Sequence, residues 1–209
     1  EVNLWREISP ELQVRFSRPA NLPNADNILR QGMLDLPRSR EAVDVLLVNP
    51  PAPKRERWLP SGRRVSQRTA RQMASSQVPL AQLAALLQPA YKVAVVDARA
   101  QRISWVDFEA LIQSYEPVYY LTYLTAATLK NDMVGAFLAK SLRACTIGFG
   151  PYITPIPVET MRAFPSLDYA LLGEPDLTLR DLIDHLEGKV SERPLSIQRL
   201  FTQHDPSYR

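Results

Sequence analysis

Short apolar runs alternate with amphipathic stretches over the middle of the chain. Buried parallel strands read as continuous apolar runs, whereas helices show apolar residues three or four positions apart. On this basis the sequence predicts strands at residues 43–50, 92–98, 117–124, 143–150 and 168–174, and helices at residues 78–90, 104–115, 128–142, 157–164 and 176–188. Such alternation indicates an α/β fold, with a parallel sheet covered by helices on both faces.

Residue types at the expected helix ends support these boundaries. Ser104 and Asp107 suit an N-cap and an acidic first turn for the helix at residues 104–115. Pro89 and Gly188 are typical of the residues that stop a helix.

The two ends of the chain lack the alternation. Residues 1–42 are interrupted by prolines and show no sustained period, so we expect an N-terminal arm there. The domain then covers residues 43–188, and residues 189–209 form a C-terminal tail. A length of 209 residues, 45% of them apolar, suits one domain with such appendages.

Five units with right-handed crossovers fit most simply into a flavodoxin-like (Rossmann-like) sheet of five strands in the order 2-1-3-4-5. Open α/β sheets bind ligands beyond the carboxyl ends of the strands, where the strand order reverses. We therefore expect a crevice lined by the four loops that follow strands one, three, four and five. The candidate binding residues in these loops are Asn49, Pro50, Pro51, Thr125, Ala126, Thr128, Gly150, Tyr152, Thr154, Gly173 and Glu174.

Residue types in these loops exclude several common ligands. Dinucleotide binding needs glycines after the first strand, and Asn49-Pro50-Pro51 removes amide donors instead. A phosphoacceptor receiver domain needs aspartates where the sequence has Val48-Asn49 and Tyr123-Leu124. The P-loop motif GxxxxGK[ST] is absent from the sequence.

Five blocks of sequence carry a resemblance to a known family. They are LLVNPP, PLAQLAALL followed by VAVVDA, LTYLTAATL, FGPYITPIPVETM and DYALLGEPDLTLRDLI, which fall in order between Val43 and Gly188. Together they resemble the cobalamin (vitamin B12)-binding domain of B12-dependent radical S-adenosylmethionine (SAM) proteins. Among these, the chain is most similar to the group containing the anaerobic magnesium-protoporphyrin IX monomethyl ester cyclase of tetrapyrrole biosynthesis. The resemblance implies a corrinoid over the strand ends, with its nucleotide tail between the sheet and the later loops.

The chain departs from the pattern of this family at two loops. Other B12 domains carry Asp-x-His-x-x-Gly after the first strand, where the histidine ligates cobalt, but residues 49–54 read NPPAPK. The resemblance therefore implies cobalamin bound base-off, without a histidine ligand. The family also commonly has Gly-Gly-Pro-His-Val-Thr near strand four, where this chain has Phe149 for the first glycine and Tyr152 for the histidine. We expect Phe149 to narrow the channel for the tail.

The number of cysteines limits which metal clusters the chain can hold. Radical SAM enzymes hold a [4Fe–4S] cluster on a CxxxCxxC motif, and Cys145 is the one cysteine in the sequence. We therefore expect no iron–sulfur cluster and no catalysis by this chain alone. A radical SAM module must then be separate, or missing from this sequence.

A basic segment lies between the first predicted strand and the first predicted helix. Although the net charge is only +3, much of the excess falls in residues 54–71, KRERWLPSGRRVSQRTAR. We expect a solvated or protein-docking loop, because the segment has few stacking aromatics and no RNA-binding motif. The sequence has no apolar run long enough to cross a membrane and no signal-peptide core at its start, so we expect a cytoplasmic protein.

Three hypotheses follow. The first is a cobalamin-binding domain that serves a radical SAM module. The second is a non-catalytic scaffold with a degenerate B12 site, which docks on a larger assembly through the N-terminal arm and the 54–71 loop. The third is a binder of nucleic acid or of an anionic surface through that loop.

Overall fold

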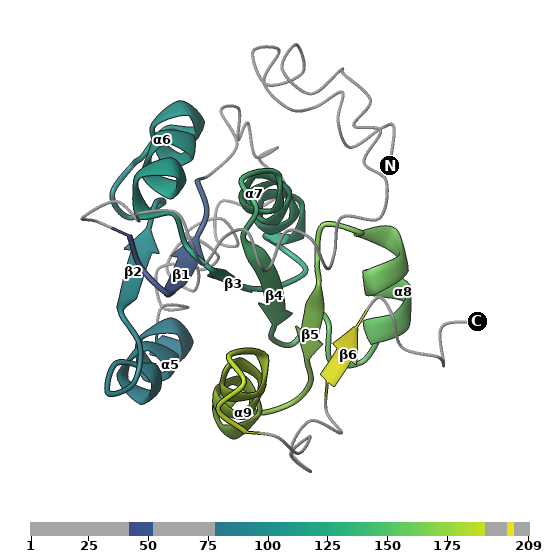
Figure 1. Ribbon diagram of the computed structural model, residues 1–209. Helices are drawn as coiled ribbons and strands as arrows, with labels where there is room; N and C mark the ends of the chain where they lie inside the picture. Colours follow the sequence, from purple (N-terminus) through teal and green to yellow (C-terminus); the bar gives the residue numbers. More distant parts are fainter. Residues whose placement is uncertain (1–41, 52–77, 191–199, 203–209) are drawn as a thin grey trace, which may run out of the picture.

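The computed structural model describes residues 42–51, 78–190 and 200–202. Within them a six-stranded sheet lies between two layers of helices (Figure 1). The strands are β1 (Val45–Asn49), β2 (Val93–Asp97), β3 (Tyr119–Tyr123), β4 (Cys145–Phe149), β5 (Tyr169–Leu171) and β6 (Leu200–Thr202). The helices are α5 (Val78–Leu87), α6 (Trp105–Tyr115), α7 (Leu129–Ser141), α8 (Pro157–Ala163) and α9 (Asp176–Leu186).

The first five strands are parallel and follow the order β2-β1-β3-β4-β5. This confirms the predicted flavodoxin-like fold and its strand order. The order reverses at β1, where the chain passes first to β2 on one side and later to β3 on the other. Asn49 pairs in register with Asp97, and Val48 with Thr122, so the ends of these three strands are level.

A sixth strand joins the sheet from the segment expected to be a tail. β6 pairs antiparallel with β5, with Ala170 opposite Phe201. Its three residues, LFT, are too short a run to give a periodic signal in the sequence. The strand is therefore stabilised by the edge of a sheet that is already formed.

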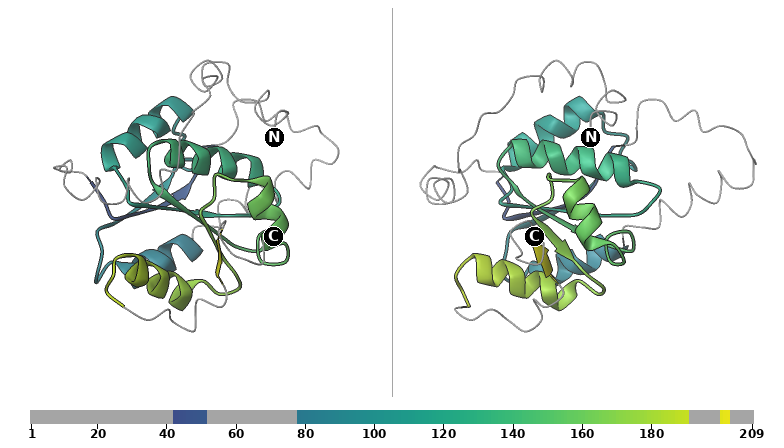
Figure 2. Two further views of the ribbon diagram at one scale, coloured as in Figure 1. Left: turned by 45° about the vertical axis from the view of Figure 1, so that its right-hand side comes forward. Right: turned by 90° about the vertical axis from the view of Figure 1, so that its right-hand side faces the viewer.

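The two faces of the sheet pack against different helices, as the two views in Figure 2 show. On one face, residues of α6, α7 and α8 pack with the inward side chains of β1 and β3, among them Leu46 and Tyr120. On the other face, α5 and α9 pack with Leu47, Leu121 and Phe149. Neighbouring strand residues alternate between the two cores, which explains why the strands are apolar at nearly every position.

The expected signals for the ends of helices appear in the structure. The Oγ of Ser104 accepts a hydrogen bond from the backbone N–H of Asp107 at 3.2 Å, as an N-cap does. α5 ends at Leu87, two residues before Pro89. Gly188 follows α9 with a φ of 70°, a left-handed conformation that glycine adopts without strain.

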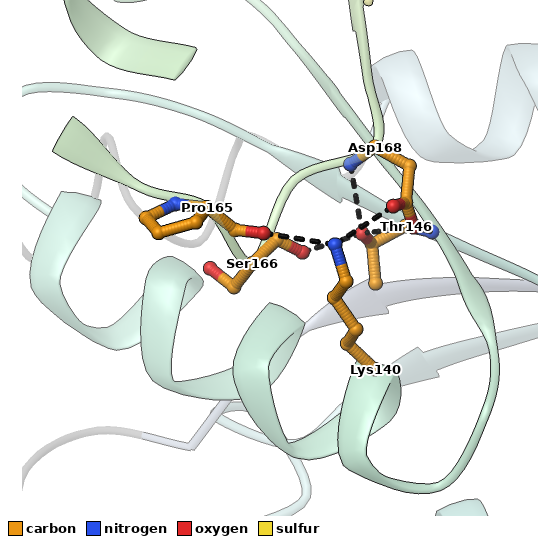
Figure 3. A network of polar contacts seen from close by, with 5 residues as sticks. All are labelled: Lys140, Thr146, Pro165, Ser166 and Asp168. Carbon is orange, nitrogen blue, oxygen red and sulfur yellow. Dashed lines mark hydrogen bonds and ion pairs between the residues drawn. The ribbon is translucent and has the colours of Figure 1, made fainter. Parts of the chain in front are cut away.

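A polar network joins α7 to the amino ends of β4 and β5 (Figure 3). Lys140 Nζ donates to Asp168 Oδ1 and to the carbonyl of Pro165, both at 2.8 Å. Asp168 Oδ2 accepts from the backbone N–H of Thr146 at 2.9 Å and from the Thr146 hydroxyl at 3.0 Å. The network fixes the last turn of α7 against the start of two strands.

Some sequence predictions fall outside the described residues. They are the N-terminal arm up to residue 41 and the basic segment 54–71. In the part of the chain that is described, no helix is both long enough and apolar enough to cross a membrane.

Candidate functional site

The candidate binding residues lie on four loops at one edge of the sheet. Each loop begins where a parallel strand ends: at Pro50 after β1, Leu124 after β3, Gly150 after β4 and Leu172 after β5. Because the strands are parallel, all four loops emerge at the carboxyl edge, on either side of the β1–β3 switch point. The strand order thus places the four loops at the edge where the sequence predicted them.

The Asn-Pro-Pro turn is fixed by polar contacts with the end of β2. Asn49 Nδ2 donates to Asp97 Oδ1 at 2.8 Å, and the same oxygen accepts from the N–H of Ala100 at 3.1 Å. The carbonyl of Pro50 accepts from Arg99 Nε at 3.3 Å. Pro50 and Pro51 are both buried, so of these three residues Asn49 is the most exposed.

The loops after β4 and β5 are tied together by Thr154. Its hydroxyl donates to the carbonyl of Gly150 at 2.9 Å and accepts from the N–H of Gly173 at 3.2 Å. Gly150 has a φ of 121°, and a Cβ there would lie 2.8 Å from the carbonyl oxygen of Leu124. Glycine is therefore required at this position by both the backbone conformation and the space.

Other candidate residues differ in how far they are exposed. Ala126, Gly173 and Glu174 are exposed, and Tyr152 is half-buried with its N–H donating to the carbonyl of Leu124 at 3.2 Å. Thr125 is half-buried and shares a hydrogen bond with Thr128, their hydroxyl oxygens 2.9 Å apart. The exposed residues are the ones that a ligand above the edge can reach without a change in the loops.

The hydroxyl of Thr128 forms its hydrogen bonds within the protein. It is buried and donates to Asp132 Oδ2 at 2.5 Å, so it makes no side-chain cap on α7. The Asp132 side chain is almost fully buried, and this burial raises its pKa to about 7 against the opposing effects of Thr128, Arg99 and the Thr125 backbone. A carboxyl in this position is poised between its two protonation states near neutral pH.

Sequence reasoning found Thr125 and Thr128 but missed Asp132, Arg99 and Tyr120. In α7 the buried positions are 132, 133, 135, 136, 138 and 139, so a carboxyl stands on the stripe that faces the core. An acidic residue on the buried stripe of a helix was the available signal. The sequence could not show that Arg99 and Tyr120 approach it from other elements.

Among the described residues, three buried polar atoms near this edge have no hydrogen-bond partner: Arg99 Nη2, Tyr120 OH and Thr122 Oγ1. Burial, followed by the charge of Asp132, raises the pKa of Tyr120 well above its ordinary value, so its phenol stays neutral. Buried polar atoms are nearly always paired in proteins, which makes such a group of exceptions a feature to explain.

His185 lies at the opposite edge of the sheet. α9 starts after the carboxyl end of β5 and runs back, and His185 is in its last turn. In the same turn Asp184 accepts a hydrogen bond from Tyr91, which precedes β2, and Glu187 accepts one from Tyr119, the first residue of β3, at 2.8 Å. His185 is therefore remote from the candidate loops, and His204 lies outside the described residues.

Phe149 occupies the place where the resembling family commonly has glycine. Its side chain is 1% exposed and packs against Tyr123 with the ring centroids 5.3 Å apart. It is part of the core between the sheet and the layer of α5 and α9. The aromatic ring therefore fills space that a glycine would leave open.

No group of three or more histidine, cysteine, aspartate or glutamate side chains in the described residues could hold a metal ion. Cys145, the first residue of β4, is half-buried and forms no disulfide.

The sequence was compared with protein-family models and with curated proteins. No family model matches the chain. The chain is similar to an uncharacterized methyltransferase of Pyrococcus horikoshii, with 28% identity over 109 residues. The match takes in 51% of this chain and 24% of that protein, so the chain spans about a quarter of the length of the relative.

Proposed function

We propose that this chain is a cobalamin-binding domain that holds the corrinoid over the carboxyl edge of the sheet for a separate catalytic module. The observation that carries the proposal is the set of four loops at this edge. Thr154 joins the loops after β4 and β5, and the Asn49–Asp97 pair fixes the end of β1 at the switch point. Flavodoxin-like sheets bind planar cofactors at this point. The radical SAM identity of the module rests on the sequence resemblance.

The residues of the edge suit the ring of a corrinoid. Ala126, Gly173 and Glu174 leave an exposed surface, and the side chains of Asn49 and Tyr152 add polar groups at its border. When bound, the cofactor would supply a cobalt centre that can exchange ligands. The residues of this chain would hold and orient it, and His185, the histidine of the described residues, lies at the opposite edge of the sheet.

The nucleotide tail fits this chain less well than the ring does. Phe149 fills its site in the core and does not provide the gap that glycine gives in the family. Recognition is then expected to depend on the ring and its side arms. Cobinamide, which lacks the nucleotide, should bind about as tightly as hydroxocobalamin.

The similarity to a protein named as a methyltransferase agrees with a carrier role. Since the chain spans about a quarter of that protein, it corresponds to one part of a larger enzyme. A domain that presents a cofactor to a catalytic module is one such part.

A direct test is the absorption spectrum of the protein after incubation with hydroxocobalamin and desalting. We expect retained cobalamin with a base-off spectrum that is unchanged in a His185→Ala variant. Ala126→Trp, which adds bulk to the exposed loop after β3, should abolish retention. Ala110→Trp, on the exposed side of α6, is the matched control and should retain it. Retention by Ala126→Trp, or a spectrum that depends on His185, would contradict the proposed site.

The buried ring of Phe149 also favours a second candidate, a scaffold that keeps the fold and has lost the cofactor. In that case the wild-type protein retains no hydroxocobalamin. Deletion of residues 1–40 should then abolish co-purification with a partner while the domain stays folded. Binding to nucleic acid or an anionic surface depends on residues 54–71, outside the described part, and stays a prediction from sequence.

A further inference from the structure

Four polar side chains come from β3, the first half of α7 and the loop after β2. We refer to Arg99, Tyr120, Thr122 and Asp132 as the polar cluster. Tyr120 and Thr122 are 0% exposed and Asp132 is 1% exposed. Three of the four carry a buried atom with no hydrogen-bond partner, namely Arg99 Nη2, Tyr120 OH and Thr122 Oγ1.

The Asn-Pro-Pro turn adjoins this cluster. Arg99 is oriented by its bond to the Pro50 carbonyl. A Cβ placed on Gly135 of α7 would meet the Tyr120 hydroxyl first and then Pro50 Cγ at 2.9 Å. Pro50 and the Tyr120 hydroxyl therefore approach the same point on α7, and the turn forms part of the wall around the cluster.

Opposite charges in the cluster are close but not in contact. The positive charge of Arg99 lowers the pKa of Asp132, and the charge of Asp132 raises that of Tyr120. Among the described residues, however, Asp132 accepts its side-chain bond from Thr128, and Arg99 donates to Pro50. Among the described residues, Arg99 and Asp132 thus influence one another through their charges without a hydrogen bond between them.

The donor and acceptor types of the unpaired atoms indicate which ligand groups could form hydrogen bonds with them. Arg99 requires an acceptor, Asp132 accepts N–H donors, and the two hydroxyls can do either. A carboxamide provides a carbonyl acceptor and two N–H donors in one small planar group. Corrinoids carry several carboxamide arms around the ring.

We infer that the polar cluster is the subsite for one carboxamide arm of the corrinoid, reached when the Asn49–Pro51 turn shifts. This inference rests on the proposed function and names residues outside the candidate loops. The arm's carbonyl accepts from Arg99 Nη2, its N–H group donates to Asp132, and Thr122 or Tyr120 completes the set. The cost of unpaired atoms in the free protein is then recovered on binding.

Thr122→Val gives the sharpest test, because valine has nearly the same shape and lacks the hydroxyl. We expect a higher midpoint of thermal unfolding for the free protein, since an unpaired buried hydroxyl is removed. We also expect hydroxocobalamin to bind at least fivefold more weakly. A purely structural role, or a hydroxyl that only binds internal water, leaves the affinity unchanged and overturns the inference.

Arg99→Met should weaken hydroxocobalamin and cobinamide alike by tenfold or more. Arg180→Met is the matched control, because Arg180 lies on α9 with a side chain that is 46% exposed, and it should bind as wild type does. The heptamethyl ester of cobyrinic acid keeps carbonyl acceptors and has no amide N–H groups. It should bind wild type more weakly than cobinamide does, and Asp132→Asn should not weaken it further.

The outcomes separate the two proposals. Wild-type protein that does not retain hydroxocobalamin overturns the proposed function and the subsite with it. Wild-type retention together with unchanged affinity in Thr122→Val and Arg99→Met overturns the subsite alone. Circular dichroism of each variant establishes that a loss of affinity is not a loss of fold.

Discussion

Two groups of polar side chains, one at each edge of the sheet, differ in how they are hydrogen-bonded. At the amino edge, Lys140, Thr146 and Asp168 saturate one another and the neighbouring backbone (Figure 3). Towards the carboxyl edge, Arg99, Tyr120 and Thr122 each keep a buried polar atom without a partner. A saturated network stabilises the free protein, whereas unpaired groups reduce its stability. The difference agrees with the proposal that the polar cluster serves a ligand. It concerns these two groups alone, because His185 Nδ1, at the amino edge, is also buried without a partner among the described residues.

The largest expected effect is a dependence of stability on pH through Asp132. Burial raises its pKa from 3.8 to about 7, so the folded state holds the proton more tightly than the unfolded state. The stability that this provides is complete below about pH 4 and is lost as the pH rises through 7. At about 1.4 kcal/mol per pKa unit, the loss relative to Asp132→Asn should reach roughly 4 kcal/mol.

Urea unfolding of wild type and Asp132→Asn between pH 4 and pH 8 measures this difference. The groups of the described residues that face the carboxyl are Arg99, Tyr120 and Thr128, and all are retained in the variant. Asp107→Asn, which removes an exposed carboxylate from the first turn of α6, provides the baseline. A stability difference that does not vary with pH would show that Asp132 has an ordinary pKa.

The second largest effect on stability is expected when the network of Lys140, Thr146 and Asp168 at the amino edge is broken. Asp168→Ala removes one of the two acceptors of Lys140, the acceptor of the Thr146 N–H and one of the two acceptors of the Thr146 hydroxyl. The buried Thr146 is thereby left with fewer partners. We expect a loss of about 2 kcal/mol in the free energy of unfolding, moderated because the Lys140 and Asp168 side chains are 37% and 30% exposed. Asp168→Asn keeps an acceptor for Thr146 and should lose less in the same denaturant titration. Equal losses in the two variants would assign the effect to the ion pair.

The same contrast explains what the sequence could predict. Strands such as β1 and β3 pack against helices on both faces of the sheet, so their sequences are continuous apolar runs. The alternation of these runs with helices was sufficient to predict the strand order. β6 left no signal, because three residues gain their stability from pairing with β5. The candidate loops follow from the topology. The polar cluster does not, because its members come from a loop, a strand and a helix that only the tertiary structure brings together.

The smallest effect concerns the contact of Gly135 with Tyr120, and it sharpens the contrast by isolating one unpaired group. Tyr120→Phe removes a buried hydroxyl that has no partner, so the free energy of unfolding should stay level or rise slightly. Gly135→Ala introduces a Cβ against that hydroxyl and against Pro50 Cγ at 2.9 Å, which should cost about 1–2 kcal/mol. In the Tyr120→Phe background the nearest obstacle is gone, so the cost of Gly135→Ala should fall by about half, a coupling that a double-mutant cycle detects.

Gly188→Ala is the control, since a Cβ there meets nothing within 4 Å and its cost reflects the φ of 70° alone. It should combine additively with Tyr120→Phe, and additivity of Gly135→Ala as well would mean that the Tyr120 hydroxyl is free to move away and is not held in the polar cluster.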